Sequence, residues 1–138
     1  MITQIKGRLI EKSPTEVIVD CNGIGYSVNI SLNTFSKIGN DENIKLFTYL
    51  IIKEDSHSLY GFFDKSERSL FKLVISVSGV GASTGRMMLS SLSPNEIISA
   101  ILNENVQIIQ SIKGIGLKTS QRIISVSYTH LRAHETAC

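Results

Sequence analysis

Hydrophobic positions in the first part of the chain recur with the period of two that is typical of β-strands. Residues 24–30 place isoleucine, tyrosine, valine and isoleucine on one face. A second β-type run covers residues 17–21, and Asn22-Gly23 lies between the two runs. Asn-Gly is a strong signal for a tight turn between antiparallel strands. We therefore predict a β-hairpin over residues 17–30.

Three further runs complete the predicted β region, over Ile2–Lys12, Ile44–Ile52 and Ser58–Phe62. The middle one is apolar on both faces, and a short helical turn is expected near Leu32–Lys37. Five strands in about 60 residues suit a small closed barrel of the OB type. The periodicity alone supports an SH3-like barrel equally well.

From Asp64 the period changes to that of helices. Asp64 is a plausible N-cap, and Glu67 three residues later completes a capping-box-like pattern before a run of helically spaced apolar residues. Farther on, Ser93 precedes a proline and is expected to cap one helix, while Asn103 is expected to cap the next. The fold class is therefore α+β: a five-stranded barrel over residues 1–62, then an all-α domain over residues 63–126.

The helical region contains a duplicated segment. Val77–Thr84 recurs 35 residues later as Ile112–Thr119, and both copies read apolar–x–Gly–apolar–Gly before the start of a helix. Glycines allow a sharp turn and let backbone N–H groups approach a partner closely. We expect the apolar residue between them to turn inward. The helix that follows starts with unpaired N–H groups and a positive dipole end, which suit a phosphate.

One Gly-x-Gly between helices is usually a simple turn, but two copies in register favour binding of a phosphate backbone. Lys118 and Arg122, four residues apart, would add positive charge along one helix face. Motifs for nucleotide binding fail on spacing: the glycine that a P-loop needs is missing before Lys118, and Thr84 stands where the dinucleotide fingerprint has its third glycine. The candidate DNA-binding residues are Gly79, Val80, Gly81, Ala82, Ser83, Gly114, Ile115, Gly116, Leu117, Lys118, Thr119 and Arg122.

Charge and composition add modest constraints. The formal net charge is only +2, but residues 1–62 hold six Lys/Arg against seven Asp/Glu, whereas residues 63–138 hold eight against five. This asymmetry of charge suggests that the two halves have different functions. The N-terminus lacks the apolar stretch of a signal peptide, no window is apolar enough to span a membrane, and Cys21 and Cys138 make no disulfide framework. We expect a cytoplasmic protein without cofactor or metal.

Several separate motifs, in order, resemble the RuvA family, which comprises the Holliday-junction-binding subunit of the bacterial branch-migration machine. The resemblance covers about residues 1–125. It implies an OB barrel followed by a tandem helix-hairpin-helix domain, and a homotetramer that holds an open, square junction and can pair into an octamer on DNA. The motifs are Gly7-Arg8-Leu9-Ile10, Val19 through Gly25-Tyr26, Lys53-Glu54-Asp55, Leu59-Tyr60-Gly61-Phe62 and the two Gly-x-Gly hairpins.

The resemblance also implies an acidic pin and a set of partners. The pin falls on Glu54 and Asp55, which would otherwise read as a polar turn between strands. Like charges from four subunits would repel phosphates at the crossover and disfavour ordinary duplex. In the family the partners are the RuvB ATPase and the RuvC resolvase. The chain itself is then a DNA-binding subunit, not an enzyme.

Two departures from the family stand out. Ala82-Ser83-Thr84 offers no basic residue just after the first hairpin, where family members often have one, and Arg86 is farther along the helix. Residues 127–138 do not match the family's charged helix, linker and C-terminal domain. We interpret this tail as foreign sequence, expect it to be disordered, and expect the contact with RuvB to be lost. His130, His134 and Cys138 sit at helical spacing, but we do not interpret them as metal ligands.

Other classes of DNA-binding protein remain as alternatives. A generic helix-hairpin-helix repair protein, or a docking module of a nuclease, would bind duplex backbone; a nuclease would also need clustered carboxylates or histidines for a metal, and only Glu54-Asp55 cluster, near His57. A single-strand-binding OB module would expose aromatic residues between Lys/Arg along its strands. We interpret the aromatics Tyr26, Phe47 and Tyr49 mostly as core.

Overall fold

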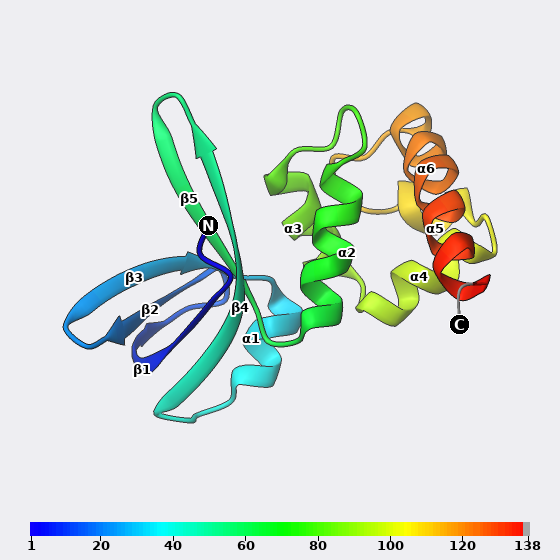
Figure 1. Ribbon diagram of the computed structural model, residues 1–138. Coiled ribbons are helices and arrows are strands. Elements are labelled where there is room, and N and C mark those ends of the chain that lie inside the picture. The colour runs from blue at the N-terminus through cyan, green and yellow to red at the C-terminus, as the bar shows by residue number, and fades with distance from the viewer. Residues whose placement is uncertain (137–138) are drawn as a thin grey trace. The chain divides into compact units, whose positions relative to one another are not determined.

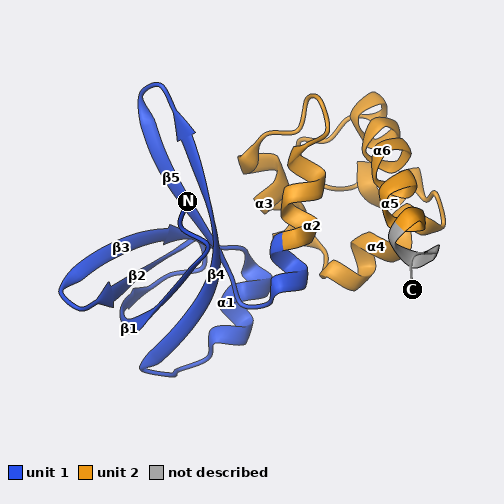
Figure 2. Cartoon of the chain, viewed as in Figure 1, with its two compact units in different colours: residues 1–68 blue, residues 69–138 orange. Residues whose placement is uncertain are grey.

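The computed structural model describes residues 1–136, and the side chains of residues 1–133. The chain forms two compact units, of which unit 1 is Met1–Arg68 and unit 2 begins at Ser69 (Figure 2). We placed the domain boundary after residue 62. The division falls later, inside a helix, because the first turn of that helix is tied to the barrel.

Unit 1 is a closed five-stranded barrel with the strand order β1-β2-β3-β5-β4, in which β1 also pairs with β4 (Figure 1). The neighbours are antiparallel except β3 and β5, which run parallel. The predicted OB-type barrel is confirmed. Its elements are β1 (Gln4–Lys12), β2 (Glu16–Cys21), β3 (Ile24–Asn29), α1 (Leu32–Ile38), β4 (Asn43–Lys53) and β5 (Ser56–Phe62).

The β2–β3 hairpin turns at Asn22-Gly23, as predicted. Both residues have positive φ, 53° and 94°, the geometry for which Asn-Gly is favoured in two-residue turns. The apolar face predicted for β3 is only partly buried. Val28 is fully buried, whereas Ile24 at the turn end is 59% exposed because it extends beyond the barrel core.

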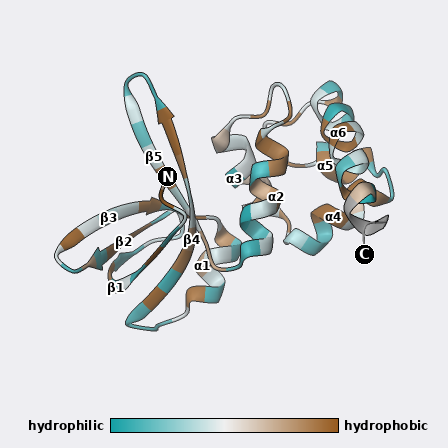
Figure 3. Ribbon diagram, viewed as in Figure 1, coloured by the Kyte–Doolittle hydropathy of each residue, from teal (hydrophilic) through white to brown (hydrophobic). Residues whose placement is uncertain are grey.

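The outer face of β4 corrects our interpretation of two aromatic residues. Leu46 and Thr48 point into the barrel and are buried, whereas Phe47 and Tyr49 are half-buried and lie outside the barrel core. Because side chains alternate along a strand, a β4 that lines the barrel must expose every second residue on the other side. Figure 3 shows the hydrophobic positions of β4 continuing toward the tip of its hairpin with β5.

Helix α1 and the first turn of α2 (Lys65–Ile75) are joined by a buried carboxylate. Ser31 caps α1 by accepting a hydrogen bond from the Thr34 backbone N–H. The hydroxyls of Ser31 and Thr34 both donate to the Glu67 carboxylate at 2.5 Å, and Glu67 is fully buried. The predicted role of Glu67 in a capping box is therefore wrong. Asp64 accepts a hydrogen bond from Lys37 at 2.6 Å.

Unit 2 contains helices and no strand among its described residues, as predicted for the all-α domain, and buries apolar side chains from these helices. No helix among residues 1–136 combines the length and apolar character needed to cross a membrane. After α2 the helices are α3 (Ala82–Ser91), α4 (Pro94–Leu102), α5 (Val106–Gln110) and α6 (Leu117–Thr136). Their largest fully buried side chains include Phe71, Met88, Leu89, Ile97, Ile101, Ile109 and Ile123.

The helix caps in unit 2 follow the sequence at one end of α4 and depart from it at the other. Ser93 and Glu96 form a capping box, as a helix opening at Pro94 predicts. The Ser93 backbone N–H donates to the Glu96 carboxylate and lowers the pKa of Glu96 below its ordinary value. Asn103 does not cap the next helix, because it ends α4 and Asn105 caps α5 instead.

The expectation of a disordered tail is wrong for residues 127–136, because α6 continues through Thr136; residues 137–138 lie outside the described part of the chain. Residues 127–136 contain no glycine or proline that would stop the helix. Tyr128 and Arg132, one turn apart, also stack, with the guanidinium carbon 5.9 Å from the ring centroid. Ser127 is fully buried and its hydroxyl has no partner among the described residues, which is a local mismatch in an otherwise regular helix.

Candidate nucleic-acid interface

The first hairpin joins α2 to α3 in the geometry that its sequence predicts. Gly79 has a φ of 90°, which favours glycine, and Val80 turns inward and is only 6% exposed. The Val80 N–H donates to the Val77 carbonyl at 3.0 Å and closes the turn. Gly81 precedes α3 and no side chain caps it. The first backbone N–H groups of any helix lack intrahelical acceptors. In α3 no capping side chain among the described residues accepts a hydrogen bond from these groups either.

The second hairpin joins α5 to α6 and repeats this geometry. Gly114 has a φ of 89°, and Ile115 is buried to 5% exposure. The Ile115 N–H donates to the Ile112 carbonyl at 3.2 Å. Leu117, Lys118 and Thr119 form the first turn of α6, and both Leu117 and Lys118 are exposed.

Three backbone hydrogen bonds of the first hairpin recur in the second hairpin at the offset of the sequence repeat. Each hairpin also has a serine hydroxyl that donates to the carbonyl three residues earlier, from Ser76 to Leu73 and from Ser111 to Ile108. The duplication is therefore a duplication of backbone geometry as well as of sequence. In each matching pair a backbone N–H donates to a carbonyl: Val77 to Val74 and Ile112 to Ile109, Val80 to Val77 and Ile115 to Ile112, and Gly85 to Gly81 and Ser120 to Gly116.

Gly81 and Gly116 are glycines that neither the fold nor the packing requires. Their φ angles are not positive, and a Cβ added at either position would meet nothing within 4 Å. Gly85 is different, since its Cβ would lie 2.8 Å from Ile75, so close packing of α2 and α3 accounts for it. A glycine with open space in front of it leaves the neighbouring N–H groups accessible to an incoming group. The surface at Gly81 and Gly116 therefore suits a partner that approaches the backbone closely.

Arg122 connects the two hairpins, a role that its sequence position does not reveal. Its side chain extends from α6 and donates through Nη1 to the Ser78 carbonyl at 2.6 Å, next to Gly79. We predicted only that Arg122 would share a helix face with Lys118. Its actual position puts a guanidinium at the first hairpin, whose own helix begins with Ala82-Ser83-Thr84 and carries no cation in its first turn. Arg86 lies farther along α3 and has an interaction of its own.

Two protein-family models match the chain. The RuvA N terminal domain matches residues 1–61, and the SAM-like helix-hairpin-helix tandem matches residues 71–126. Curated relatives described as Holliday junction branch migration complex subunit RuvA align over 124 residues, or 90% of this chain. They come from Flavobacterium psychrophilum at 63% identity, Christiangramia forsetii at 62% and Bacteroides fragilis at 55%. The chain belongs to the RuvA family.

The chain spans 62–64% of the length of these RuvA relatives. Both duplicated hairpins lie within the match to the helix-hairpin-helix tandem, which ends at residue 126. The resemblance that we stated from separate sequence motifs is confirmed by these comparisons.

The acidic residues expected from the RuvA resemblance lie at the tip of a long hairpin. Glu54 and Asp55 form the two-residue turn between β4 and β5, and Lys53 pairs with Ser56 beside it. Both carboxylates are exposed, and Figure 1 shows the β4–β5 hairpin standing away from the other strands of unit 1. Four such tips gathered at one point would form a concentrated negative charge.

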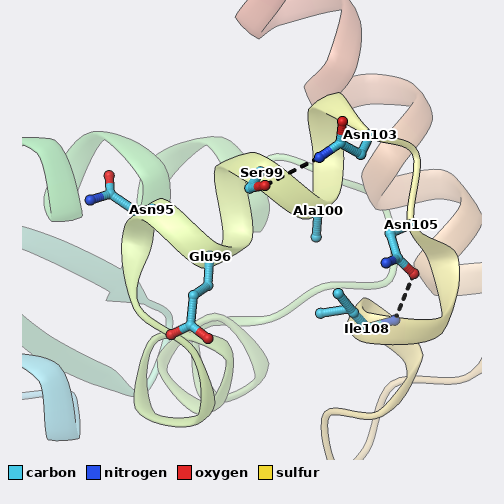
Figure 4. A pocket seen from close by; sticks show the side chains of 7 residues that line it. All are labelled: Asn95, Glu96, Ser99, Ala100, Asn103, Asn105 and Ile108. Carbon is cyan, nitrogen blue, oxygen red and sulfur yellow. Dashed lines mark hydrogen bonds between the residues drawn. The ribbon is translucent and has the colours of Figure 1, made fainter.

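The hollow between α4 and α5 has a different character from the hairpins (Figure 4). Its volume is about 320 Å³, and its polar groups serve the ends of helices. Asn103 donates to Ser99 at 3.2 Å, Asn105 accepts from the Ile108 N–H at 3.3 Å, and Glu96 belongs to the capping box. None of the predicted DNA-binding residues lines it.

No group of three potential metal-ligating side chains comes together in the part of the chain that the structure describes. His130 is exposed on α6 and lines a second, separate hollow together with Ser76 and residues of α2. The side chain of His134 and the whole of Cys138 lie outside the described residues.

Proposed function

We propose that this chain binds DNA through the phosphate backbone, with one site at each hairpin. The observation that supports it best is the pair Gly81 and Gly116, two equivalent glycines with open space before them at the start of α3 and α6. Phosphate oxygens accept hydrogen bonds from such N–H groups, and the positive end of each helix dipole adds to the attraction. Lys118 and Arg122 add positive charge at these sites.

We further propose that the DNA is a four-way junction. The relatives are described as Holliday junction branch migration complex subunits. The acidic tip also favours a junction, because its carboxylates would only repel the phosphates of a continuous duplex. In this proposal four chains assemble so that Glu54 and Asp55 of each meet at the crossover. Their carboxylates repel phosphates there and hold the arms apart.

In the proposed assembly the chain is a binding subunit without catalytic activity of its own. Work on the junction would come from a RuvB-type ATPase partner, and cleavage from a RuvC-type resolvase. These partnerships belong to the proposal for the full-length relatives, of which this chain spans less than two thirds.

Titration of a labelled four-way junction over a range of salt concentrations tests the proposal. Backbone binding predicts that the logarithm of the association constant falls linearly with the logarithm of salt, with a slope of about −0.9 per phosphate neutralised. It also predicts the same affinity after the base sequence of the arms is shuffled, because backbone amides read no base edges. A slope near zero, or a strong dependence on arm sequence, would contradict the proposal.

A further inference from the structure

Three cationic side chains gather over one aromatic ring on unit 1. Lys45 and Lys65 place Nζ 5.1 and 5.5 Å from the centroid of the Phe47 ring, and the guanidinium carbon of Arg68 lies 5.6 Å from it. Because all three cations lie within 5.6 Å of the same ring centroid, any two of them are separated by at most about twice that distance. This separation is comparable to the Debye length of about 8–10 Å at moderate salt. The three charges therefore act on an approaching ion together. We call these four residues the Phe47 cluster.

The structure holds part of the Phe47 cluster in place. Arg68 donates to the backbone carbonyls of Thr3 at 2.7 Å and Thr48 at 3.4 Å, which fixes its guanidinium beside the ring. The electron-rich face of an aromatic ring attracts cations and offsets part of their mutual repulsion. Lys45 and Lys65 are both exposed, so their ammonium groups remain accessible to solvent.

The charge of the cluster is not paired with a carboxylate in the salt bridges that the structure shows for unit 1. These join Arg8 with Asp20 and Lys37 with Asp64, and neither includes a cluster residue. Lys6 adds to the positive charge, because it is the direct cross-strand partner of Lys45 on β1, an arrangement that costs stability for like charges.

This concentration of cations runs against the balance of unit 1, where residues 1–68 hold eight Lys/Arg and nine Asp/Glu. Two acids adjoin cluster residues in the sequence. Glu67, next to Arg68, is buried and bonded to two hydroxyls, and Asp64, next to Lys65, pairs with Lys37. Unit 1 thus carries an unbalanced positive patch despite its acid excess.

We propose that the Phe47 cluster is a phosphate-binding site for the DNA backbone, on the barrel and additional to the two hairpins. This inference rests on the proposed function, since it gives the same DNA a third contact. DNA carries one negative charge per about 1.7 Å of helix axis, so several cations held close together can each find a phosphate. Lys45 and Lys65 bind the phosphates, Arg68 is the fixed member, and Phe47 holds the group together.

The test compares Lys45→Gln, Lys65→Gln and the double variant with Lys12→Gln in the full chain. Lys12 is a matched control because it also lies over a ring, 5.2 Å from the Phe35 centroid, but as a single cation. Each cluster substitution is expected to reduce the salt slope for junction binding by about 0.9, and the double variant by about twice that. Lys12→Gln should leave the slope unchanged.

The outcomes separate this inference from the proposed function. If the wild-type chain binds the junction with a steep salt slope and the double variant keeps that slope, the cluster is not a DNA contact and the hairpin proposal stands. If the wild-type chain does not bind the junction, the proposed function fails and this inference fails with it. If the double variant changes the mass of the protein in solution but not the slope, the cluster joins copies of the chain, which also overturns the inference.

Discussion

Replacing Gly116 with valine is expected to weaken binding of a four-way junction while leaving the protein folded. A Cβ at this position meets nothing within 4 Å and the φ angle is not positive, so the substitution does not crowd the free protein. The branched side chain would instead occupy the space through which a phosphate reaches the N–H groups of α6. Loss of one charge-assisted hydrogen bond costs about 1.5–3 kcal/mol, which corresponds to roughly 10- to 100-fold in affinity.

Gly81→Val should have a comparable effect at the first hairpin, and the two substitutions together should reduce binding further. Ser125→Val is the matched control, because it adds a similar side chain at an exposed position on α6 away from the hairpins. Gly114→Val should also weaken binding, but it strains a backbone with a φ of 89° and therefore reports folding as well. Unchanged junction affinity in a folded Gly81→Val/Gly116→Val double variant would show that the hairpins are only connectors.

Replacing Glu67 with alanine is expected to have the largest effect on stability. The substitution removes two buried hydrogen bonds and leaves the buried hydroxyls of Ser31 and Thr34 without their acceptor. Each unsatisfied buried polar group costs about 1–3 kcal/mol, so the loss of the acceptor for two hydroxyls should lower the free energy of unfolding by about 2–6 kcal/mol. Denaturant unfolding followed by circular dichroism measures this change.

Two comparisons make the Glu67 result specific. Glu96→Ala removes a carboxylate from an exposed capping box on α4 and should cost less than Glu67→Ala. Glu67→Gln keeps an oxygen acceptor and most of the side-chain shape, so it should also be milder. A fall in the free energy of unfolding below about 0.5 kcal/mol for Glu67→Ala lies in the range of ordinary surface substitutions. It would contradict a stabilising role for the buried hydrogen bonds between Glu67 and α1.

The features that could be predicted from the sequence are those set by neighbouring residues. The Asn22-Gly23 turn depends on two residues that accept positive φ. The two hairpins depend on glycines and one inward-facing apolar residue within a short segment, and the structure confirms both turns. The closed barrel required more, because the periodicity fitted an SH3-like barrel equally well and only the strand pairing distinguishes the two.

The features that the sequence did not reveal depend on residues far apart in the chain. Glu67 reads as a local capping residue until the structure brings α1 next to α2. Arg122 reads as one more charge on α6, although its partner is Ser78 in the other hairpin. Phe47 reads as core because its strand is apolar on both faces, whereas the barrel leaves that face outside, where cations gather on the ring. Local patterns do not contain such pairings.

Competition between two unlabelled DNAs for the same labelled junction tests the central claim most directly. One competitor is a four-way junction, and the other is a linear duplex with the same arm sequences and the same number of phosphates. Binding at the two hairpins, with Glu54 and Asp55 excluding phosphates from the crossover, predicts that the junction competes at least tenfold more strongly than the duplex. Equal competition by the duplex would contradict the account, and the chain would then be a general binder of DNA backbone.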